Sequence, residues 1–396
     1  MFPTDIVIVA GARTPMARYT GSFSDISAID LGAHAAKEAI RRSGVNPDEI
    51  DHAIFGNVLQ TSADAIYGAR HVALKAGLPV ATPAVTVNRL CGSGIEAIVQ
   101  AAQRVLLGEA NIVLAGGMEN MTQAPFVIRG ARTGLKLGGG ALEDFLFVGL
   151  TDSYCGMPMA LTAEKLAERT GITRKDSDAY ALRSQQAAEA ASRAGYFKEE
   201  IVPVEVKQGK KTILVSEDDH RRPETTMETL EKLPPSFKKD GMVTAGNASG
   251  IVDGAAAVVV THEKTARERG WKPMGKIIAW AVAGVDPTIM GIGPVPSTRK
   301  ALERAGLNLK QIDRLEVNEA FASQYLAVEK ELGLERDKTN VNGGAIALGH
   351  PLGASGTRLV ITVLNELRRK NLRYGLATAC IGGGQGIAMI VEAVEN

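Results

Sequence analysis

The chain reads KEAIRRSGVN at residues 37–46 and RKALERAGLN at residues 299–308, so one pattern occurs in both halves. Each stretch has the form of a helix that ends at a glycine and turns into a strand. The offset between the copies is constant, since 306 − 44 = 262 and 313 − 51 = 262. We interpret the repeat as a duplication of an αβ unit, although helix–glycine–strand turns are common enough to coincide by chance. Six residues recur identically at this offset: Ala39, Arg42, Gly44, Asn46, Ile50 and Asp51.

Short apolar runs alternate with longer helical patterns along the rest of the chain. A Ser-x-x-Asp signal at 27–30 begins a helix that ends at Gly44, and a Thr-x-x-Asp signal at 173–176 begins another that ends near Gly195. Most apolar runs lack strict polar alternation, which is typical of strands buried on both faces. This order predicts an α/β architecture in which helices cover the sheets. The predicted strands are Ile6–Ala10, Ala53–Gly56, Ala84–Asn88, Ile112–Ala115, Ala255–Thr261, Lys276–Ala283, Arg314–Val317 and Gly386–Val391.

The domain organisation follows from the repeat and from a change of character between its copies. Strand signals become sparse after Glu119 and return near Gly246, and the part between them carries several charged helical patterns. We predict that this part is a lid, inserted into the first half and placed over a site. The expected divisions are an N-terminal half at 1–265, with its core at about 1–119 and 247–265 and the lid at about 120–246, and a C-terminal half at 272–396.

The composition excludes several classes of protein. The 396 residues carry 45 Lys+Arg and 44 Asp+Glu, a net charge of +1, and aromatic residues make up only 5%. This balance provides neither electrostatic attraction for nucleic acid nor a base-stacking surface. No apolar run reaches the roughly 18 residues that span a bilayer, and the N-terminus lacks a signal-peptide pattern. We therefore expect no nucleic-acid partner, no membrane insertion, and a location in the cytoplasm or, as a mature form, in an organellar matrix.

The strongest candidate nucleophile is Cys91, in the cluster NRLCGSG at residues 88–94. The three cysteines of the chain are too few, and odd in number, for a disulfide framework. Cys91 lies between an apolar strand and the amphipathic segment Ile95–Leu107, so we expect it at a helix N-terminus. Backbone N–H groups and the helix dipole favour a thiolate there, which should lower the pKa of the thiol. The alternative is a buried structural cysteine.

Two further glycine-rich clusters lie in the second half. His350 lies within NVNGGAIALGHPLGASG at 340–356, and a histidine near a cysteine is a common means of activating a thiol. The alternative for His350 is a turn or capping role. Cys380 begins CIGGGQG at 380–386, whose backbone N–H groups are suited to an oxyanion. Because the two Cys–Gly turns lie in opposite halves, we expect symmetry to bring Cys91 and Cys380 to equivalent places that face each other.

Other motifs are absent or incomplete. Gly92-x-Gly94-x-x-Ala97 follows a strand and formally matches a dinucleotide fingerprint, so an NAD-binding enzyme is a rival interpretation. A cysteine in the first turn, and the lack of the pattern in the duplicate, argue against it. The sequence contains no P-loop, CxxC or HExxH motif, so we expect no metal site.

Taken together, the clusters resemble the thiolase family, and the resemblance covers essentially the whole chain. The nucleophile motif is matched at Asn88–Gly94 and the pantetheine segment at Thr244–Gly250. The resemblance implies the thiolase fold: two pseudo-symmetric βαβ-type halves in a five-layer α-β-α-β-α sandwich, with the lid in the first half. The three C-terminal motifs are matched at Val317-Asn-Glu-Ala-Phe321, Asn342–Gly356 and Cys380–Gly386.

The resemblance also implies a mechanism. Cys91 would attack the ketone carbon of a 3-ketoacyl-CoA and become acylated, and His350 would accept its proton. Cys380 would act as the general acid and base at the α-carbon of acetyl-CoA. Asn318 would hold a water that forms one oxyanion site with His350, and the N–H groups of Cys91 and Gly382 would form the other. No metal or tightly bound cofactor is implied, because coenzyme A and acyl-CoA are substrates.

Coenzyme A contacts and an assembly are implied as well. Arg222, Thr225 and Ser249 would contact CoA, and Arg222 would pair with the nucleotide phosphates. From the residues alone, a solvated charge in the basic run at 220–222 explains Arg222 better. The resemblance implies a homodimer or a homotetramer.

The lid contains one informative departure from the family pattern. Acetoacetyl-CoA-specific biosynthetic thiolases carry a His-Met-Gly run where this chain has Pro158-Met159-Ala160. We therefore expect thiolytic cleavage of 3-ketoacyl-CoA to acetyl-CoA and a shortened acyl-CoA, as in fatty-acid β-oxidation, together with the reverse condensation. The alternative is a biosynthetic acetyl-CoA acetyltransferase. Cys155, in the same stretch, is expected to be structural. A non-catalytic carrier would lack catalytic residues that are present here, and a ketoacyl synthase typically lacks the second cysteine, Cys380.

Overall fold

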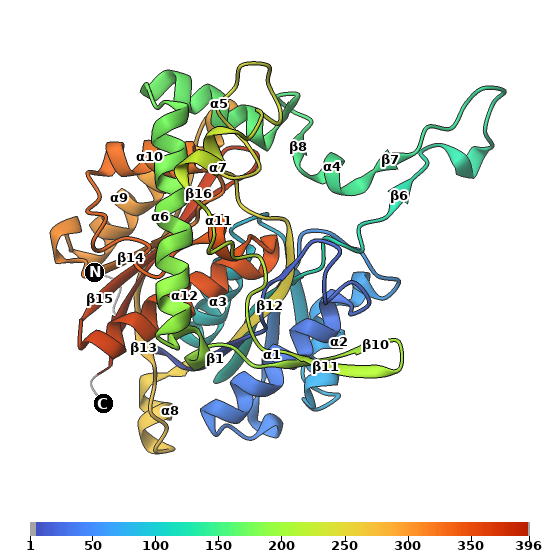
Figure 1. Ribbon diagram of the computed structural model, residues 1–396. Coiled ribbons are helices and arrows are strands. Elements are labelled where there is room, and N and C mark those ends of the chain that lie inside the picture. Colours follow the sequence, from blue (N-terminus) through green and yellow to red (C-terminus); the bar gives the residue numbers. More distant parts are fainter. Residues whose placement is uncertain (1–4, 395–396) are drawn as a thin grey trace.

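The computed structural model describes residues 5–394, and one mixed sheet runs through it. Its strands are ordered β14-β15-β16-β13-β1-β12-β5-β3-β4, and β2 pairs with β12. The β1–β13 pair joins the strands of the two halves (Figure 1). The bounds are β1 Ile6–Arg13, β2 Ala17–Arg18, β3 His52–Gly56, β4 Ala84–Val87, β5 Ile112–Glu119, β12 Val252–His262, β13 Gly275–Gly284, β14 Arg314–Val317, β15 Tyr374–Ile381 and β16 Gln385–Ala393.

The predicted elements are present. All eight predicted strands occur, with ends that differ by up to four residues. Helix α1, Ala28–Ser43, is capped by Ser27 and ends at Gly44, whose φ of 70° requires the left-handed region that glycine tolerates. Helix α6, Arg174–Arg193, begins with the predicted capping box at Thr173. Strand β15 was not predicted, because its sequence, YGLATACI, has few of the β-branched residues that signal a strand.

The structure confirms the internal duplication. Strand β5 spans 112–119 and strand β15 spans 374–381, so both ends follow the offset, since 112 + 262 = 374 and 119 + 262 = 381. The recurring aspartates, Asp51 and Asp313, also accept hydrogen bonds from backbone N–H groups at equivalent positions. The Asp51 carboxylate accepts the N–H groups of residues 111 and 112 at 2.7 and 3.0 Å. Asp313 accepts those of residues 373 and 374 at 3.0 and 2.9 Å.

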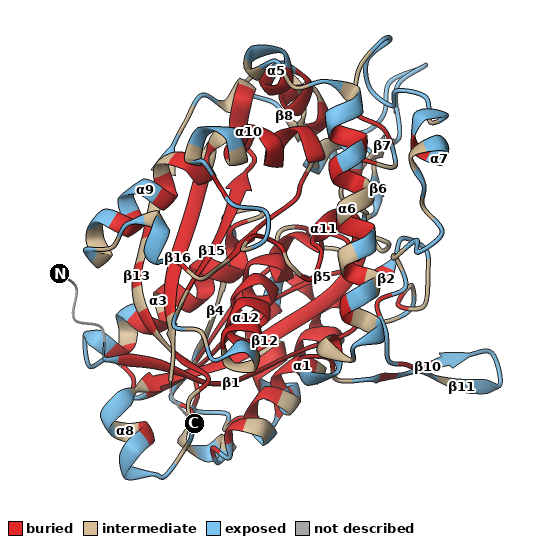
Figure 2. Ribbon diagram, turned by 60° about the vertical axis from the view of Figure 1, so that its left-hand side comes forward, coloured by how far each residue is buried: buried red, intermediate tan, exposed pale blue. Residues whose placement is uncertain are grey.

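Apolar packing divides the molecule into the five predicted layers. One outer layer, α1 with α2 (Gly68–Ala76), packs against β1, β5 and β12. The other, α9 (Pro294–Ala305) with α10 (Ala322–Leu332), packs against β13–β16. Between the two sets of strands lie α3 (Ser93–Leu106) and α12 (Leu352–Lys370), which contact both. In α12, 16 of 19 residues are buried, as expected for a helix enclosed on all sides (Figure 2).

The two central helices touch through glycines that are equivalent in the duplication, since 94 + 262 = 356. A Cβ placed on Gly94 would lie 2.5 Å from the backbone N of Thr357, and one on Gly356 would lie 2.4 Å from that of Ile95. Only glycine permits this approach. The contact brings the N-termini of α3 and α12 together. These are the helix ends that follow Cys91 and His350.

The chain leaves the sheet after β5 and returns to it at β12. The segment around β6 and β7 extends far from the body (Figure 1), and no helix among residues 5–394 is long and apolar enough to cross a membrane. The elements of this segment are β6 Phe126–Val127, β7 Glu143–Asp144, α4 Phe145–Gly149, β8 Thr151–Asp152, β9 Met157–Pro158, α5 Met159–Thr170, α6, β10 Val204–Gln208, β11 Lys211–Val215 and α7 Met227–Glu231; α8 Glu263–Glu268 and α11 Ala345–Leu348 lie beyond it.

Candidate active site

Cys91 lies in a sharp turn between β4 and α3. The preceding residue, Leu90, has a φ of 45°, a conformation that side chains rarely adopt and that often marks a functional turn. Two side chains hold the turn. Asn88 Oδ1 accepts the Leu90 N–H at 2.9 Å, and the Ser93 hydroxyl donates to the Leu90 carbonyl at 2.6 Å. The predicted position of Cys91, at a helix N-terminus, is confirmed.

The predicted lowering of the Cys91 pKa is wrong. Burial raises the pKa of the Cys91 thiol to about 11, and the negative charge of Glu119 adds to this. Hydrogen bonding to the N–H groups of Gly382 and of Cys91 itself acts in the opposite direction. Desolvation of a thiolate therefore outweighs the favourable helix terminus. Cys91 keeps a partly accessible surface, so the resting site holds a thiol that a ligand can reach.

His350 lies on the loop between α11 and α12 and is 5% exposed. Its Nδ1 lies 2.5 Å from the Ser355 hydroxyl, which itself donates to the Pro351 carbonyl at 2.9 Å. Because the single hydroxyl proton is used there, we assign the proton of that contact to His350 Nδ1. Burial, followed by the charge of Arg358, lowers the pKa of His350 to about 3. The imidazole is therefore neutral at pH 7, and its Nε2 carries no proton, as a base requires.

Asn318 directly follows β14 and faces this imidazole. Its Nδ2 lies 3.3 Å from His350 Nε2, and its N–H donates to the Thr378 carbonyl at 2.9 Å. Its Oδ1 is buried and has no hydrogen-bond partner among the described residues. A buried amide oxygen without a partner is unfavourable unless a water or ligand occupies the space beside it.

Cys380 is fully buried near the C-terminal end of β15. Burial raises the pKa of its thiol well above the usual range, and the charge of Cys91 adds to this, so the two sulfurs lie close together. Their places are not equivalent, contrary to the prediction. The 262-residue offset relates Cys380 to Met118, at the end of β5, and relates Cys91 to Gly353, at the start of α12. The cysteines therefore meet because β15 and α3 both border the central layer.

Gly382 begins the turn after β15. A Cβ at this position would lie 3.1 Å from both Leu90 Cδ1 and Met159 Sδ, so a larger residue would press on the cysteine turn and on α5. The N–H of Gly382 forms a hydrogen bond to Cys91, and its role as an oxyanion donor, which the family resemblance implies, stays a prediction.

The three predicted CoA residues lie on two loops. Arg222 and Thr225 form one turn, in which the Thr225 hydroxyl donates to the Arg222 carbonyl at 2.7 Å. The Arg222 side chain is exposed and forms no ion pair within residues 5–394. Ser249 lies nearer the catalytic cluster, since its N–H donates to the Ala320 carbonyl at 3.0 Å. Among the described residues, the hydrogen bonds of Arg222 go to Gln185 and Thr225 and not to the cluster around Cys91.

Two functional candidates were missed by sequence reasoning. His220 packs against Gly250: a Cβ added to Gly250 would lie 2.1 Å from the His220 Nε2. The Gly250 carbonyl in turn accepts the His350 N–H at 2.9 Å. Burial, followed by the charge of Arg222, lowers the pKa of His220 to about 4. The other is Glu119, a buried carboxylate at the end of β5. Glu119 ends the apolar run that forms β5, and an acidic residue at the end of a wholly buried strand is rare enough to have indicated a functional role.

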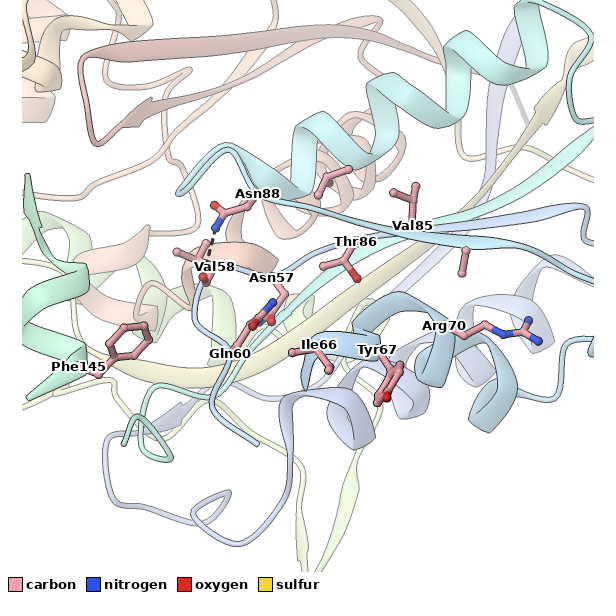
Figure 3. A pocket seen from close by; sticks show the side chains of 12 residues that line it. Asn57, Val58, Gln60, Ile66, Tyr67, Arg70, Val85, Thr86, Asn88 and Phe145 are labelled. Carbon is pink, nitrogen blue, oxygen red and sulfur yellow. Dashed lines mark hydrogen bonds between the residues drawn. The ribbon is translucent and has the colours of Figure 1, made fainter. Parts of the chain in front are cut away.

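A cavity of about 620 Å³ lies beside the cysteine turn, on the side of β4 (Figure 3). Val58 and Phe145 line it and also pack in the cluster that contains Cys91. Asn88 donates across its wall to the Val58 carbonyl at 3.2 Å (Figure 3). Within residues 5–394, no group of His, Cys, Asp and Glu is arranged to hold a metal ion.

Comparison with known proteins gives the family. Models of the thiolase N-terminal domain and the thiolase C-terminal domain match residues 6–264 and 271–393. The chain is 54% identical to the mitochondrial 3-ketoacyl-CoA thiolase of Homo sapiens, over 98% of each chain. It is 47% identical to an acetyl-CoA acetyltransferase of Syntrophomonas wolfei, over 98% of this chain and 99% of that one. A crystal structure of the human thiolase superposes with a TM-score of 0.97 at 53% identity, covering 98% of this chain and 99% of that one. The chain belongs to the thiolase family.

Proposed function

We propose that the chain is an acyltransferase that cleaves 3-ketoacyl-CoA with coenzyme A, yielding acetyl-CoA and a shortened acyl-CoA, and that also catalyses the reverse condensation. The observation that carries this proposal is a partly accessible thiol, Cys91, whose charge acts on a second, buried thiol, Cys380. Cys91 also packs in one cluster with Leu352, two residues after the neutral imidazole of His350. These are a nucleophile, a base and an acid for breaking a bond between two carbons.

The proposed reaction begins with Cys91 as a thiol. His350 Nε2 accepts its proton while the sulfur attacks C3 of the substrate, and the ketone oxygen becomes an oxyanion. When the C2–C3 bond breaks, its electron pair remains on the acetyl-CoA fragment as an enolate, and Cys380 protonates that carbon. The thiol of a second CoA then passes its proton to the Cys380 thiolate as it attacks the acyl-Cys91 thioester. The carbon–sulfur bond to Cys91 breaks, the shortened acyl-CoA is released, and protonated His350 returns its proton to Cys91. The raised pKa of both thiols supports proton transfer at the moment of reaction rather than a thiolate in the resting enzyme.

Two oxyanion sites support these steps. The unpaired Asn318 Oδ1 supports a water held between Asn318 and His350, which would donate to the thioester oxygen of the enolate. The N–H groups of Cys91 and Gly382 would donate to the oxyanion on the acylated carbon. Each such donor typically lowers a barrier by about 3 kcal/mol, because it is fixed before charge develops.

Coenzyme A would bind along the loops that carry Arg222, Thr225 and Ser249. The exposed guanidinium of Arg222 is suited to phosphate. The structure of the human mitochondrial thiolase in complex with CoA, at 53% identity and a TM-score of 0.96, supports coenzyme A as a substrate. We propose no tightly bound cofactor, since the reaction described transfers an acyl group between thiols.

The degradative interpretation is favoured over the biosynthetic one. The similar proteins at 51–54% identity are named 3-ketoacyl-CoA thiolase, and those at 47–49% are named acetyl-CoA acetyltransferase. The run Pro158-Met159-Ala160 in the lid points the same way.

An oligomer is also proposed. The segment around β6 and β7, which extends far from the body, exposes apolar side chains that a monomer would leave in water. These side chains support a homodimer or homotetramer. A mitochondrial location is supported by the name of the human relative, and the cytoplasm is the alternative. The exposed side chains of the segment around β6 and β7 are Phe126, Ile128, Leu135, Leu137 and Leu142.

The test is thiolysis of 3-ketoacyl-CoA substrates from four to sixteen carbons, with Cys91→Ser as the control. Activity on longer chains that disappears in Cys91→Ser supports the proposal. Cleavage of acetoacetyl-CoA alone would assign the chain to the biosynthetic alternative. An absence of cleavage at every chain length would refute the proposed function.

A further inference from the structure

Glu119 is a fully buried carboxylate whose four hydrogen bonds come from two separate parts of the chain. Its Oε1 accepts the Asn57 amide and the Leu59 N–H, both at 3.0 Å. Its Oε2 accepts the Val58 N–H at 3.1 Å and the Gly353 N–H at 2.8 Å. Each oxygen thus has two N–H donors, and none of these groups can accept a proton from a carboxylic acid.

This arrangement favours the ionised form of Glu119. Burial raises the pKa of Glu119 to about 7, and the charge of Asp253 acts in the same direction. The N–H donors act against this increase. A protonated carboxyl would place an O–H against one of those donors, so the hydrogen-bond pattern fits a carboxylate.

The two parts that Glu119 joins are the two sides of the proposed active site. Val58 and Leu59 pack in the cluster that contains Cys91. Gly353 stands at the start of α12, three residues after His350. The link leaves little freedom, because a Cβ on Gly117 would lie 1.9 Å from the Gly353 carbonyl oxygen. Glu119 therefore connects Val58 and Leu59, which pack with Cys91, to helix α12, which begins two residues after His350.

A second buried carboxylate anchors the other side of the histidine loop. Glu319 accepts the Tyr180 and Ser184 hydroxyls, both at 2.7 Å, and the Ile346 N–H at 3.1 Å. Ile346 precedes His350 by four residues, so the loop is fixed on both sides by carboxylates, one from each half of the fold. Glu119 differs from Glu319 in one respect: its charge acts on Cys91.

We propose that Glu119 is a positioning residue of the thiolase reaction, whose carboxylate fixes the start of α12, beside His350, relative to the residues that pack against Cys91. Its negative charge adds to burial in disfavouring the Cys91 thiolate. This inference rests on the proposed roles of Cys91 and His350. It concerns a residue outside the glycine-rich clusters that carry those roles.

The first variant is Glu119→Gln, which retains the shape but loses the charge. The amide N–H₂ of the glutamine must then face two of the four N–H donors, which cannot accept a hydrogen bond. The hydrogen bonds to Val58 and Leu59, or the one to the start of α12, are therefore lost. Displacement of reacting groups by about 1 Å can lower a rate about 100-fold. We expect kcat for thiolysis to fall by about that factor while KM for CoA stays unchanged, because Glu119 contacts neither loop that carries the proposed CoA residues.

A second measurement separates the charge of Glu119 from its structural role. Alkylation of Cys91 by iodoacetamide, followed peptide by peptide against pH, reports the thiol directly. Removing a negative charge favours the thiolate, so the profile of Glu119→Gln should shift to lower pH. Glu319→Gln, which disrupts the other anchor, should leave that profile unchanged. Glu119→Asp keeps the charge and shortens the link, so it should lower kcat without shifting the profile.

The outcomes are distinguishable. A lower kcat together with a shifted alkylation profile in Glu119→Gln supports the proposal, and an unchanged profile or an unchanged kcat overturns it. If Glu119→Gln does not fold, as judged by thermal melting, then Glu119→Asp decides: wild-type kcat or a shifted profile overturns the proposal. If the wild-type enzyme cleaves no 3-ketoacyl-CoA, the proposed function fails, while the alkylation profiles still test the action of Glu119 on Cys91.

Discussion

Replacing Ser355 with alanine tests how the base of the site is held. In the structure, His350 Nδ1 lies 2.5 Å from the Ser355 hydroxyl, whose own proton goes to the Pro351 carbonyl. Ser355→Ala removes the only hydrogen-bond partner of Nδ1 among residues 5–394, whereas the Pro351 carbonyl keeps the Ser355 backbone N–H at 2.9 Å. The loss is therefore confined to the imidazole, which becomes free to turn or to place its proton on Nε2.

The expected magnitude follows from leaving a buried donor without a partner. That loss costs about 1–3 kcal/mol. At 1.36 kcal/mol for each tenfold change in rate, kcat for thiolysis should fall by about 5- to 150-fold. KM for CoA should change little, because the hydrogen bonds of the Ser355 side chain go to His350 and Pro351 and not to the proposed CoA residues Arg222 and Thr225. Steady-state thiolysis of acetoacetyl-CoA, with CoA varied, separates the two constants.

The matched control is Ser323→Ala. Ser323 is also buried in a helix of the second half, but its hydroxyl has no partner among the described residues, so its removal breaks no hydrogen bond. A Ser355→Ala enzyme that melts like Ser323→Ala and retains kcat within twofold of the wild type would refute the assignment of the proton to Nδ1 and the orienting role of Ser355.

Three further predictions concern the thiol, the fold and the central contact. The raised pKa of Cys91 predicts that its alkylation in the free enzyme increases about tenfold per pH unit from pH 7 to beyond 9; a plateau near pH 8.5 in the Cys91 peptide would contradict this. Asp218→Asn should lower the free energy of unfolding by about 3–5 kcal/mol in denaturant titrations, because it removes the charge of a fully buried partner of Arg13. The control, Arg41→Ala, removes one partner of an exposed ion pair and should change that free energy little. Gly356→Ala should lower that free energy by about 1–3 kcal/mol and reduce kcat, because the added Cβ pushes α12 from α3. The control is Gly284→Ala, whose added Cβ would be uncrowded. Equal stability of the two variants would count against the close contact between α3 and α12.

Local signals were sufficient for the elements and for the duplication. Ser27, Gly44 and Thr173 cap helices where the sequence places them, because a capping residue acts on backbone groups within a few positions of itself. Strand β15 escaped prediction because its residues are small, and its place in the sheet comes from its partners, β14 and β16.

The chemistry of the site divides in the same way. The glycine-rich clusters identify Cys91, His350 and Cys380 as candidates, because residue type and spacing are local properties. The protonation of these groups is not local: Cys91 was expected to have a lowered pKa, and burial raises it instead. Desolvation depends on everything that surrounds a group in space.

Sequence alone determined the α/β class, the repeat at an offset of 262 residues, and the residues that carry the proposed chemistry. Only the tertiary structure decided that Cys91 and Cys380 meet at places that the duplication does not relate, and that Glu119 joins the wall of one to the helix that follows His350. The physical reason is that these contacts link residues far apart in the chain: 234 positions for Glu119 and Gly353, and 289 for the two cysteines, since 380 − 91 = 289. Their geometry depends on how closely α3 and α12 pack at Gly94 and Gly356, which no short stretch of sequence specifies.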